Sequence, residues 1–309
     1  MLANISSYFS YLIKQILMYL AIILIAIFCL HLLLSGFVLK NINVANSLQY
    51  IINLFRLNYG DININTSISV EKIYFSYFKF SFFLINISFF ISFFISFFIS
   101  YSLCINKKNI SSSFFKFFAF IFGSLPIFIL CPLGIITASN INLPTTYIQP
   151  YYGSLFNAFI SLIFPIIILV ITILPICISI NYQILNNIIQ SDYYLMLKAN
   201  GFNKFKLFNK IVLKNWIIAY LEKVIFIYIY LISYTMIVER FFYISGQSFL
   251  FQYLDNPNYF NLLIYSILLN IVFISLIKGI CDFIVFLAMP QNFKNNIINW
   301  KVLWKKIRR

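Results

Sequence analysis

Six long apolar stretches constrain this 309-residue chain more than any other feature of its sequence. A helix needs about 20 residues to cross the roughly 30 Å of hydrocarbon in a bilayer, and each stretch is at least that long. Hydroxyl side chains inside the stretches are compatible with this role, because a helix satisfies its own backbone polar groups. We therefore expect an all-α, polytopic membrane protein with about six transmembrane helices. The expected spans are Ile16–Leu39, Phe80–Cys104, Phe117–Ala138, Leu155–Ile180, Trp216–Val238 and Leu262–Met289.

The composition excludes a soluble protein. Hydrophobic residues make up 62% of the chain and charged residues only 9%, with a mean hydropathy of +0.93. Soluble domains are roughly one quarter charged, so this chain lacks the polar surface that would keep it dissolved. Its five cysteines are dispersed through apolar stretches, which excludes a secreted disulfide scaffold and favours a role as small hydrophobic side chains.

Membrane topology explains the net charge of +15. The loops on the side that holds both termini carry fifteen Lys and Arg residues, and the loops on the opposite side carry five. This asymmetry predicts that both termini are cytoplasmic. We expect the basic tail to bind anionic membrane lipid and expect no nucleic-acid partner. The basic residues of the tail are Lys301, Lys305, Lys306, Arg308 and Arg309.

The sequence offers no catalytic group of residues and no cofactor site. His31 is the single histidine, which excludes a haem or a metal held by several histidines. No Gly-rich nucleotide loop of the GxxxxGK[ST] type is present, so the chain does not bind ATP by that route. We expect a protein that is not an enzyme and needs no cofactor.

Ionisable residues inside the spans are the usual candidates for function. Glu222 and Lys223 lie in the fifth expected span, and Lys278 and Asp282 are four residues apart in the sixth, on one helix face. We expect these pairs to neutralise each other at protein contacts or near the cytoplasmic surface. The alternative, a proton or cation relay, lacks a series of acidic residues joining the two sides. We expect His31 to be packed or directed to the outer interface.

The longest expected cytoplasmic segment, residues 181–215, differs from its surroundings. Two short amphipathic stretches flank Gly201, and glycine is a common residue at the end of a helix. Leu195 and Val212 belong to the apolar faces, and several lysines provide charge. This arrangement predicts a helix–Gly–helix hairpin along the membrane surface. A simple amphipathic linker is the alternative interpretation.

The spacing around Gly201 resembles the EAA loop of ABC-transporter permeases. In that loop a Gly is followed by nine residues, an Ile, one further residue and a Leu. Gly201, Ile211 and Leu213 match this pattern. The resemblance implies that residues 181–215 form a coupling loop that contacts a cytoplasmic ATPase.

The start of the segment resembles the dipeptide/oligopeptide type of permease. In that type an Asp-Tyr pair opens the loop and an Ala lies two residues before the Gly, as Asp192, Tyr193 and Ala199 do here. Leu197 departs from the type, because a second Ala is usual at that place. The coupling residues implied by the resemblance are Asp192, Tyr193, Leu197, Ala199, Gly201, Ile211 and Leu213.

Three further stretches support the resemblance, which covers essentially the whole chain. Glu239, Phe242 and Gly246 resemble an extracellular Glu-x-x-Phe-x-x-x-Gly motif that precedes the last span. Asp282, with Pro290 eight residues later, is similar to the end of the family's last span, although Met289 replaces a second Asp. Gly60-Asp61 resembles a Gly-Asp pair of the first outer loop, and that short loop is also similar to permeases of Sap-type systems.

The resemblance implies a fold, an assembly and a location. The fold is that of a type I ABC importer permease, with residues 1–309 forming one transmembrane domain. The implied partners are a second homologous permease, two cytoplasmic ATP-binding subunits, a periplasmic substrate-binding protein and membrane lipid. The implied task is to move peptides, or a small cationic solute such as putrescine, across the bacterial inner membrane.

Two other functions are compatible with a hydrophobic chain of this kind. A structural subunit of a membrane redox or proton-pumping complex requires acid–base relays across several spans. A multi-pass membrane enzyme requires paired catalytic groups. Neither feature is visible here, because the polar residues concentrate in one cytoplasmic segment.

Overall fold

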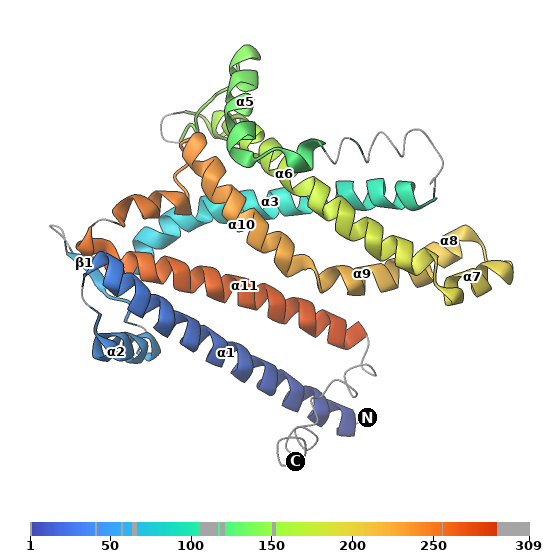
Figure 1. The fold of residues 1–309 in the computed structure, drawn as a ribbon, viewed down its shortest axis with the longest axis horizontal. Coiled ribbons are helices and arrows are strands. Elements are labelled where there is room, and N and C mark those ends of the chain that lie inside the picture. Colours follow the sequence, from blue (N-terminus) through green and yellow to red (C-terminus); the bar gives the residue numbers. More distant parts are fainter. Residues whose placement is uncertain are drawn as a thin grey trace.

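The computed structural model describes residues 2–40, 42–56, 58–63, 67–105, 117, 121–149, 153–254 and 256–288. Within these ranges the regular secondary structure is helical apart from one short β-hairpin, and five helical segments are long and apolar enough to cross a membrane. Figure 1 shows the long helices running side by side, which confirms an all-α polytopic architecture. The long helices are α1 (Leu2–Val38), α3 (Val70–Ile105), α6 (Leu155–Ile189), α10 (Val224–Phe241) and α11 (Phe260–Ala288).

The third expected span differs from a simple transmembrane helix. Residues 118–120 lie outside the described part of the chain, and the helix that follows, α5 (Ile127–Asn140), has only 14 residues. Pro126 precedes α5 as its N-cap with an extended backbone, which separates α5 from the helical residues 121–124. The hydropathy of this stretch is continuous, so only the proline indicated the interruption.

The fifth expected span is divided in two. It consists of α9 (Leu213–Leu221) followed by α10, with a turn at Glu222 and Lys223 where the helix axis bends (Figure 1). The described part of this segment contains no proline or glycine to cause the bend. The hydropathy pattern therefore gave no sign of it.

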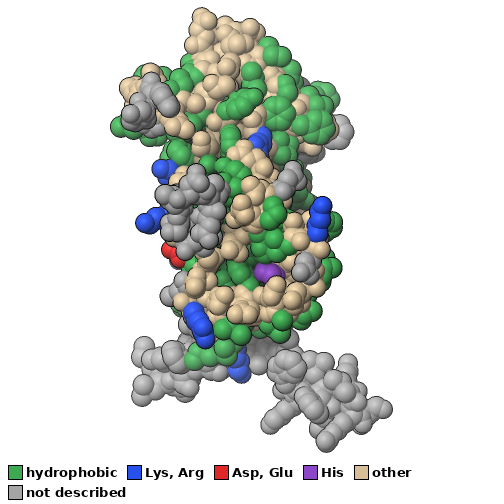
Figure 2. Space-filling view, turned by 90° about the vertical axis from the view of Figure 1, so that its left-hand side faces the viewer, with side chains coloured by type: hydrophobic (Ala, Val, Ile, Leu, Met, Phe, Trp, Pro, Cys, Tyr) green, Lys and Arg blue, Asp and Glu red, His purple; other side chains and the backbone are tan. Residues whose placement is uncertain are grey.

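Short elements cover the end of the bundle opposite α7 (Asp192–Ala199). The helix α2 (Val44–Phe55) begins at Asn43, whose side chain accepts a hydrogen bond from the Ala45 amide at 2.9 Å. The strands β1 (Asp61–Asn63) and β2 (Ser67–Ser69) pair antiparallel. Two 3₁₀ helices, η2 (Gln247–Tyr253) and η3 (Pro257–Tyr259), precede α11. Seen from this end, the surface mixes apolar side chains with uncharged polar groups and scattered Lys and Arg side chains (Figure 2).

The core lies between α3 and α6, where a row of serines lets the two helices approach closely. Ser88, Ser92, Ser96 and Ser100 of α3 are all fully buried. Small residues at such positions favour close helix packing inside a membrane. The Ser100 hydroxyl donates a hydrogen bond to the backbone oxygen of Ile178 in α6 at 3.0 Å. The serines of the second span are thus packing residues.

Two of the expectations about ionisable residues in the spans are confirmed. Lys278 and Asp282 form an ion pair at 2.5 Å, and the Tyr19 hydroxyl of α1 donates to the same carboxylate at 2.6 Å. His31 is packed, with its Nδ1 2.8 Å from the Ser47 hydroxyl of α2. These contacts hold α1 against α11 and α2, at the edge of the bundle (Figure 1).

The expectation for Glu222 and Lys223 is wrong as far as the described residues go. Both side chains are exposed, and neither forms an ion pair with another described residue. Their charges are therefore not neutralised by contacts that this part of the chain provides.

Candidate coupling hairpin

The predicted hairpin is present, and it begins later than residue 181. The helix α6 continues to Ile189, and Asn181 is buried inside the bundle. The helix α7 then begins after Ser191, whose hydroxyl accepts a hydrogen bond from the Tyr194 amide. In Figure 1 the hairpin projects beyond the bundle at the end opposite β1.

A Schellman motif ends α7 and turns the chain at Gly201. The Gly201 amide donates to the Lys198 oxygen at 3.2 Å, and the Phe202 amide donates to the Leu197 oxygen at 3.3 Å. Gly201 has a φ of +78°, a conformation that residues with side chains rarely adopt. An added Cβ atom would meet no other atom within 4 Å, so the backbone conformation, rather than lack of space, requires glycine.

The return arm of the hairpin contains one turn of π-helix. The short helix α8 (Lys204–Leu207) leads into η1 (Phe208–Val212), which continues directly into α9. Such π-turns are rare and are often found at functional sites. Here the turn buries Ile211 and Val212, and Val212 and Phe208 pack into the core that α6 and α3 share.

The seven residues implied by the family resemblance fall into two groups. Asp192, Tyr193, Ala199 and Gly201 are exposed on the projecting part of the hairpin. Leu197 is half-buried. Ile211 is buried, and Leu213 is half-buried and packs against the chain's own bundle. The structure therefore separates a free outer face from an inner face that anchors the hairpin. Val212, expected to belong to an apolar face of the hairpin, lies on the inner face.

The exposed face contains apolar side chains that the sequence pattern did not single out. Tyr193, Met196 and Phe205 are 61%, 63% and 70% exposed, and Leu195 and Phe202 are also exposed. We call these five residues the apolar tip. The sequence feature that could have identified the apolar tip is the presence of large apolar residues on both sides of a turn glycine, outside any expected span.

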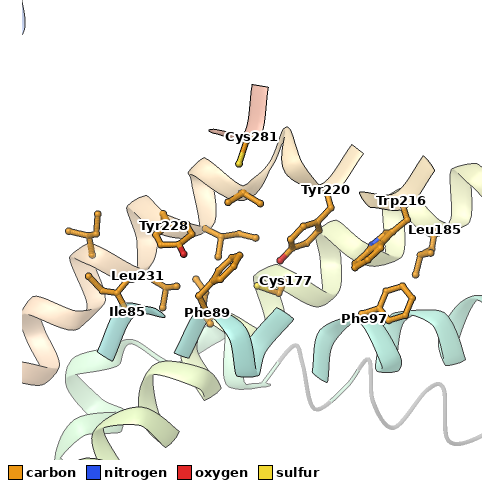
Figure 3. Close-up of a cluster of buried hydrophobic side chains, with 14 of the residues drawn as sticks. Ile85, Phe89, Phe97, Cys177, Leu185, Trp216, Tyr220, Tyr228, Leu231 and Cys281 are labelled. Carbon is orange, nitrogen blue, oxygen red and sulfur yellow. The ribbon is translucent and has the colours of Figure 1, made fainter. Parts of the chain in front are cut away.

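A buried hydrogen-bonded chain connects the return arm to two spans. The Trp216 indole of α9 donates to Asn181 of α6 at 2.7 Å, and the Asn181 amide donates to Ser96 of α3 at 2.8 Å. All three residues are buried. Figure 3 shows the indole beside Phe97 of α3, with ring centroids 4.2 Å apart. Because buried polar groups are costly to separate, this chain fixes α9 to both spans.

The other end of the same segment is held by Glu239, which is completely buried in α10. Its carboxylate accepts hydrogen bonds from the Ser81 hydroxyl of α3 and, at 2.9 Å, from the Ser248 amide of η2. A Cβ atom on Gly246 would overlap the carboxylate. The motif of the last outer loop therefore corresponds to one packed cluster, in which Glu239 lies against Gly246. Phe242, the third residue of the motif, is buried in the adjacent core.

The other predicted elements are placed only in part. Asp282 is described in its ion pair with Lys278, whereas Met289, Pro290 and the basic tail lie outside the described residues. Gly60 has a φ of +84°, so this turn favours glycine. Lys198, Lys206 and Lys210 are exposed on the hairpin. Among the described residues no group of His, Cys, Asp or Glu is arranged to hold a metal ion.

Comparison with known proteins identifies the family. The sequence profile of the family described as "binding-protein-dependent transport system inner membrane component" matches residues 92–290, which include the hairpin, Glu239 and all of α11. No curated protein matches the chain. Members of this family are membrane components of ABC transporters that work with ATPase and binding-protein partners. The match therefore argues against the alternative that the chain is a subunit of a redox complex. The chain therefore belongs to the binding-protein-dependent transport system inner membrane component family and is a multi-pass permease subunit of an ABC transporter.

Proposed function

We propose that the hairpin of residues 192–215 docks onto a cytoplasmic ATPase subunit and transmits its movement to the spans. One observation carries this proposal. The apolar tip projects from the bundle with no covering from the described chain, while the return arm is fixed inside the bundle. Exposed apolar patches on otherwise ordered elements are typical of protein contact sites.

The contacts of the hairpin define a route for the movement. A displacement of the apolar tip reaches α9 through the π-turn, because Val212 of this turn is packed in the core. The Trp216–Asn181–Ser96 chain then carries the displacement into α6 and α3. At the far end, the Glu239 cluster ties α10 to α3 and η2. The ATPase supplies the energy, and this chain supplies the linkage.

The assembly and topology follow from the same proposal. The hairpin is on the cytoplasmic side, together with both termini, as the distribution of Lys and Arg predicts. The complete transporter contains this chain, a second homologous permease, two ATP-binding subunits and a periplasmic substrate-binding protein in the bacterial inner membrane. Its substrate is a peptide or a small cationic solute such as putrescine.

Charge substitution in the apolar tip tests the docking. In Met196→Asp or Phe205→Asp, a carboxylate enters an apolar contact without a partner, which costs several kcal/mol, so ATPase binding falls about 100-fold or more. The measurement is co-purification of the ATPase with membrane-inserted permease. Asn209→Asp, an exposed position on the return arm, is the matched control. Normal co-purification of both tip variants would exclude this face as the docking surface.

A further inference from the structure

Glu222 and Lys223 form an unusual feature that the coupling route does not use. They occupy the bend between α9 and α10, where the Lys223 amide donates to Tyr220 at 2.8 Å and the Phe226 amide donates to Lys223 at 3.1 Å. These bonds to the third preceding residue tighten the helix locally, and such a turn within a long helix often marks a functional position. Both charged side chains are exposed, without an ion-pair partner among the described residues.

Contacts with α3 show how deep this bend lies. On one side of it, Trp216 is joined through Asn181 to Ser96, and on the other side the Tyr228 hydroxyl donates to Asn86 at 3.1 Å. Glu222 therefore lies level with the stretch of α3 between Asn86 and Ser96. The middle of that stretch is about 20 Å from Ile105, the hairpin end of α3, at 1.5 Å per residue. In a hydrocarbon layer of roughly 30 Å, the bend is deep inside the membrane.

A charged side chain at this depth does not face lipid. Ionisable residues inside membranes face protein or water-filled paths and mark routes for ions and substrates. Interrupted helices near the middle of the membrane are likewise typical of transporter binding sites. The bend at Glu222 has both properties.

The exposed residues beyond the bend continue on the same side of the helix. Phe226, Tyr230 and Ser233 follow Glu222 at intervals of four, four and three residues, and all are exposed. We call these four residues the α10 stripe. A carboxylate followed by aromatic rings is a set of groups that attracts ammonium ions, since the ring faces also favour cations. Ring faces offer no comparable attraction to an anion.

We propose that the α10 stripe lines the translocation path and that Glu222 binds a primary ammonium group of the transported solute. The inference rests on the proposed function, because the path exists only in the assembled transporter. A peptide with a free N-terminus and a polyamine both carry this group. Lys223 is exposed at the same bend but forms no ion pair with Glu222 in the described part of the chain, so its charge does not occupy the carboxylate.

Cysteine accessibility tests whether the stripe lines a water-filled path. Phe226→Cys is introduced into the assembled transporter in proteoliposomes, with the exposed Cys29 replaced by Ser, and is reacted with the cationic thiol reagent MTSET. Ile25→Cys on α1 is the control, because Ile25 is similarly exposed but lies on the peripheral helix. We expect Phe226→Cys to react about tenfold faster or more than Ile25→Cys. The control cysteine faces lipid, which contains no water to bring the charged reagent to it. Equal rates would overturn the assignment of the stripe to the path.

Protection of the same cysteine tests the chemistry of the solute. Putrescine and trialanine represent the two sources of an ammonium group, and N-acetyl-trialanine lacks it. We expect at least one ammonium probe to slow the reaction and the acetylated peptide to have no effect. When Glu222→Gln is added, the concentration of the ammonium probe that gives half-maximal protection rises about tenfold. A change of this size is expected for the loss of one charge-assisted hydrogen bond. Lys223→Gln, which removes the neighbouring charge, retains protection.

The outcomes separate this inference from the proposed function. Protection by putrescine alone identifies a polyamine path, and protection by trialanine alone identifies a peptide path. Protection by neither probe, or protection unchanged in Glu222→Gln, would overturn ammonium recognition. ATPase co-purification is measured on the same samples, so a failure of hairpin docking is seen independently of the stripe.

Discussion

At the scale of single residues, the two best-defined glycines act for different reasons. Gly246 is required by space, because the Glu239 carboxylate occupies the place of a side chain. Gly201 is required by its backbone conformation, because the surrounding space is open. The sequence resemblance singled out both glycines, but only the contacts distinguish a packing requirement from a conformational one.

Gly246→Ala is expected to destabilise the fold. The added methyl group displaces a buried carboxylate from the Ser81 and Ser248 hydrogen bonds, which costs about 2–4 kcal/mol. Thermal unfolding of the detergent-solubilised protein measures the loss as a lower Tm. Gly279→Ala is the matched control, since a Cβ atom there meets nothing within 4 Å. Equal Tm values for the two variants would contradict the packing role of Gly246.

Gly201→Val is expected to disrupt the turn without affecting the bundle. A β-branched residue at positive φ is strained by about 1–3 kcal/mol, and this strain is confined to the exposed hairpin. Protease cleavage at the hairpin therefore accelerates, whereas the Tm of the spans is unchanged. Gly201→Asn, which tolerates the left-handed conformation, keeps the wild-type cleavage rate. A Val variant with wild-type cleavage would contradict the conformational account.

At the scale of elements, hydropathy predicted where helices run but not where they are interrupted. The spans now seen as α1, α3, α6 and α11 follow directly from long apolar runs. The bend at Glu222 escaped prediction because the segment contains no proline or glycine that would indicate it. The inner position of Val212 also escaped prediction, because it depends on how the return arm packs onto the bundle.

Trp216→Phe tests the connection between the hairpin and the spans. The substitution keeps the aromatic packing but leaves the Asn181 oxygen without its donor, at a cost of about 1–2 kcal/mol. We expect normal ATPase binding but less solute transported per ATP hydrolysed, measured in proteoliposomes. Ser100→Ala is the control. It removes the hydroxyl that donates to the backbone oxygen of Ile178, but this oxygen lies inside α6 and keeps its place in the helix. Wild-type transport per ATP in Trp216→Phe would show that the buried chain does not carry the movement.

At the scale of the whole molecule, the two ends of the bundle are held differently. One end is tied by α2, η2 and the Glu239 cluster, and the other projects the hairpin. The sequence predicted this polarity from the positions of its charges and its turn glycine. It did not predict which hairpin residues are free, because that depends on how the return arm packs onto α6 and α3.

Site-specific photocrosslinking from the hairpin tests the central claim most directly. A photoreactive amino acid at position 205, within the apolar tip, is compared with one at position 128 of α5, which is also exposed but lies away from the hairpin. Docking of the tip predicts a covalent adduct with the ATPase subunit from position 205 and none from position 128. An adduct from neither position, with lipid as the product at 205, would contradict the account.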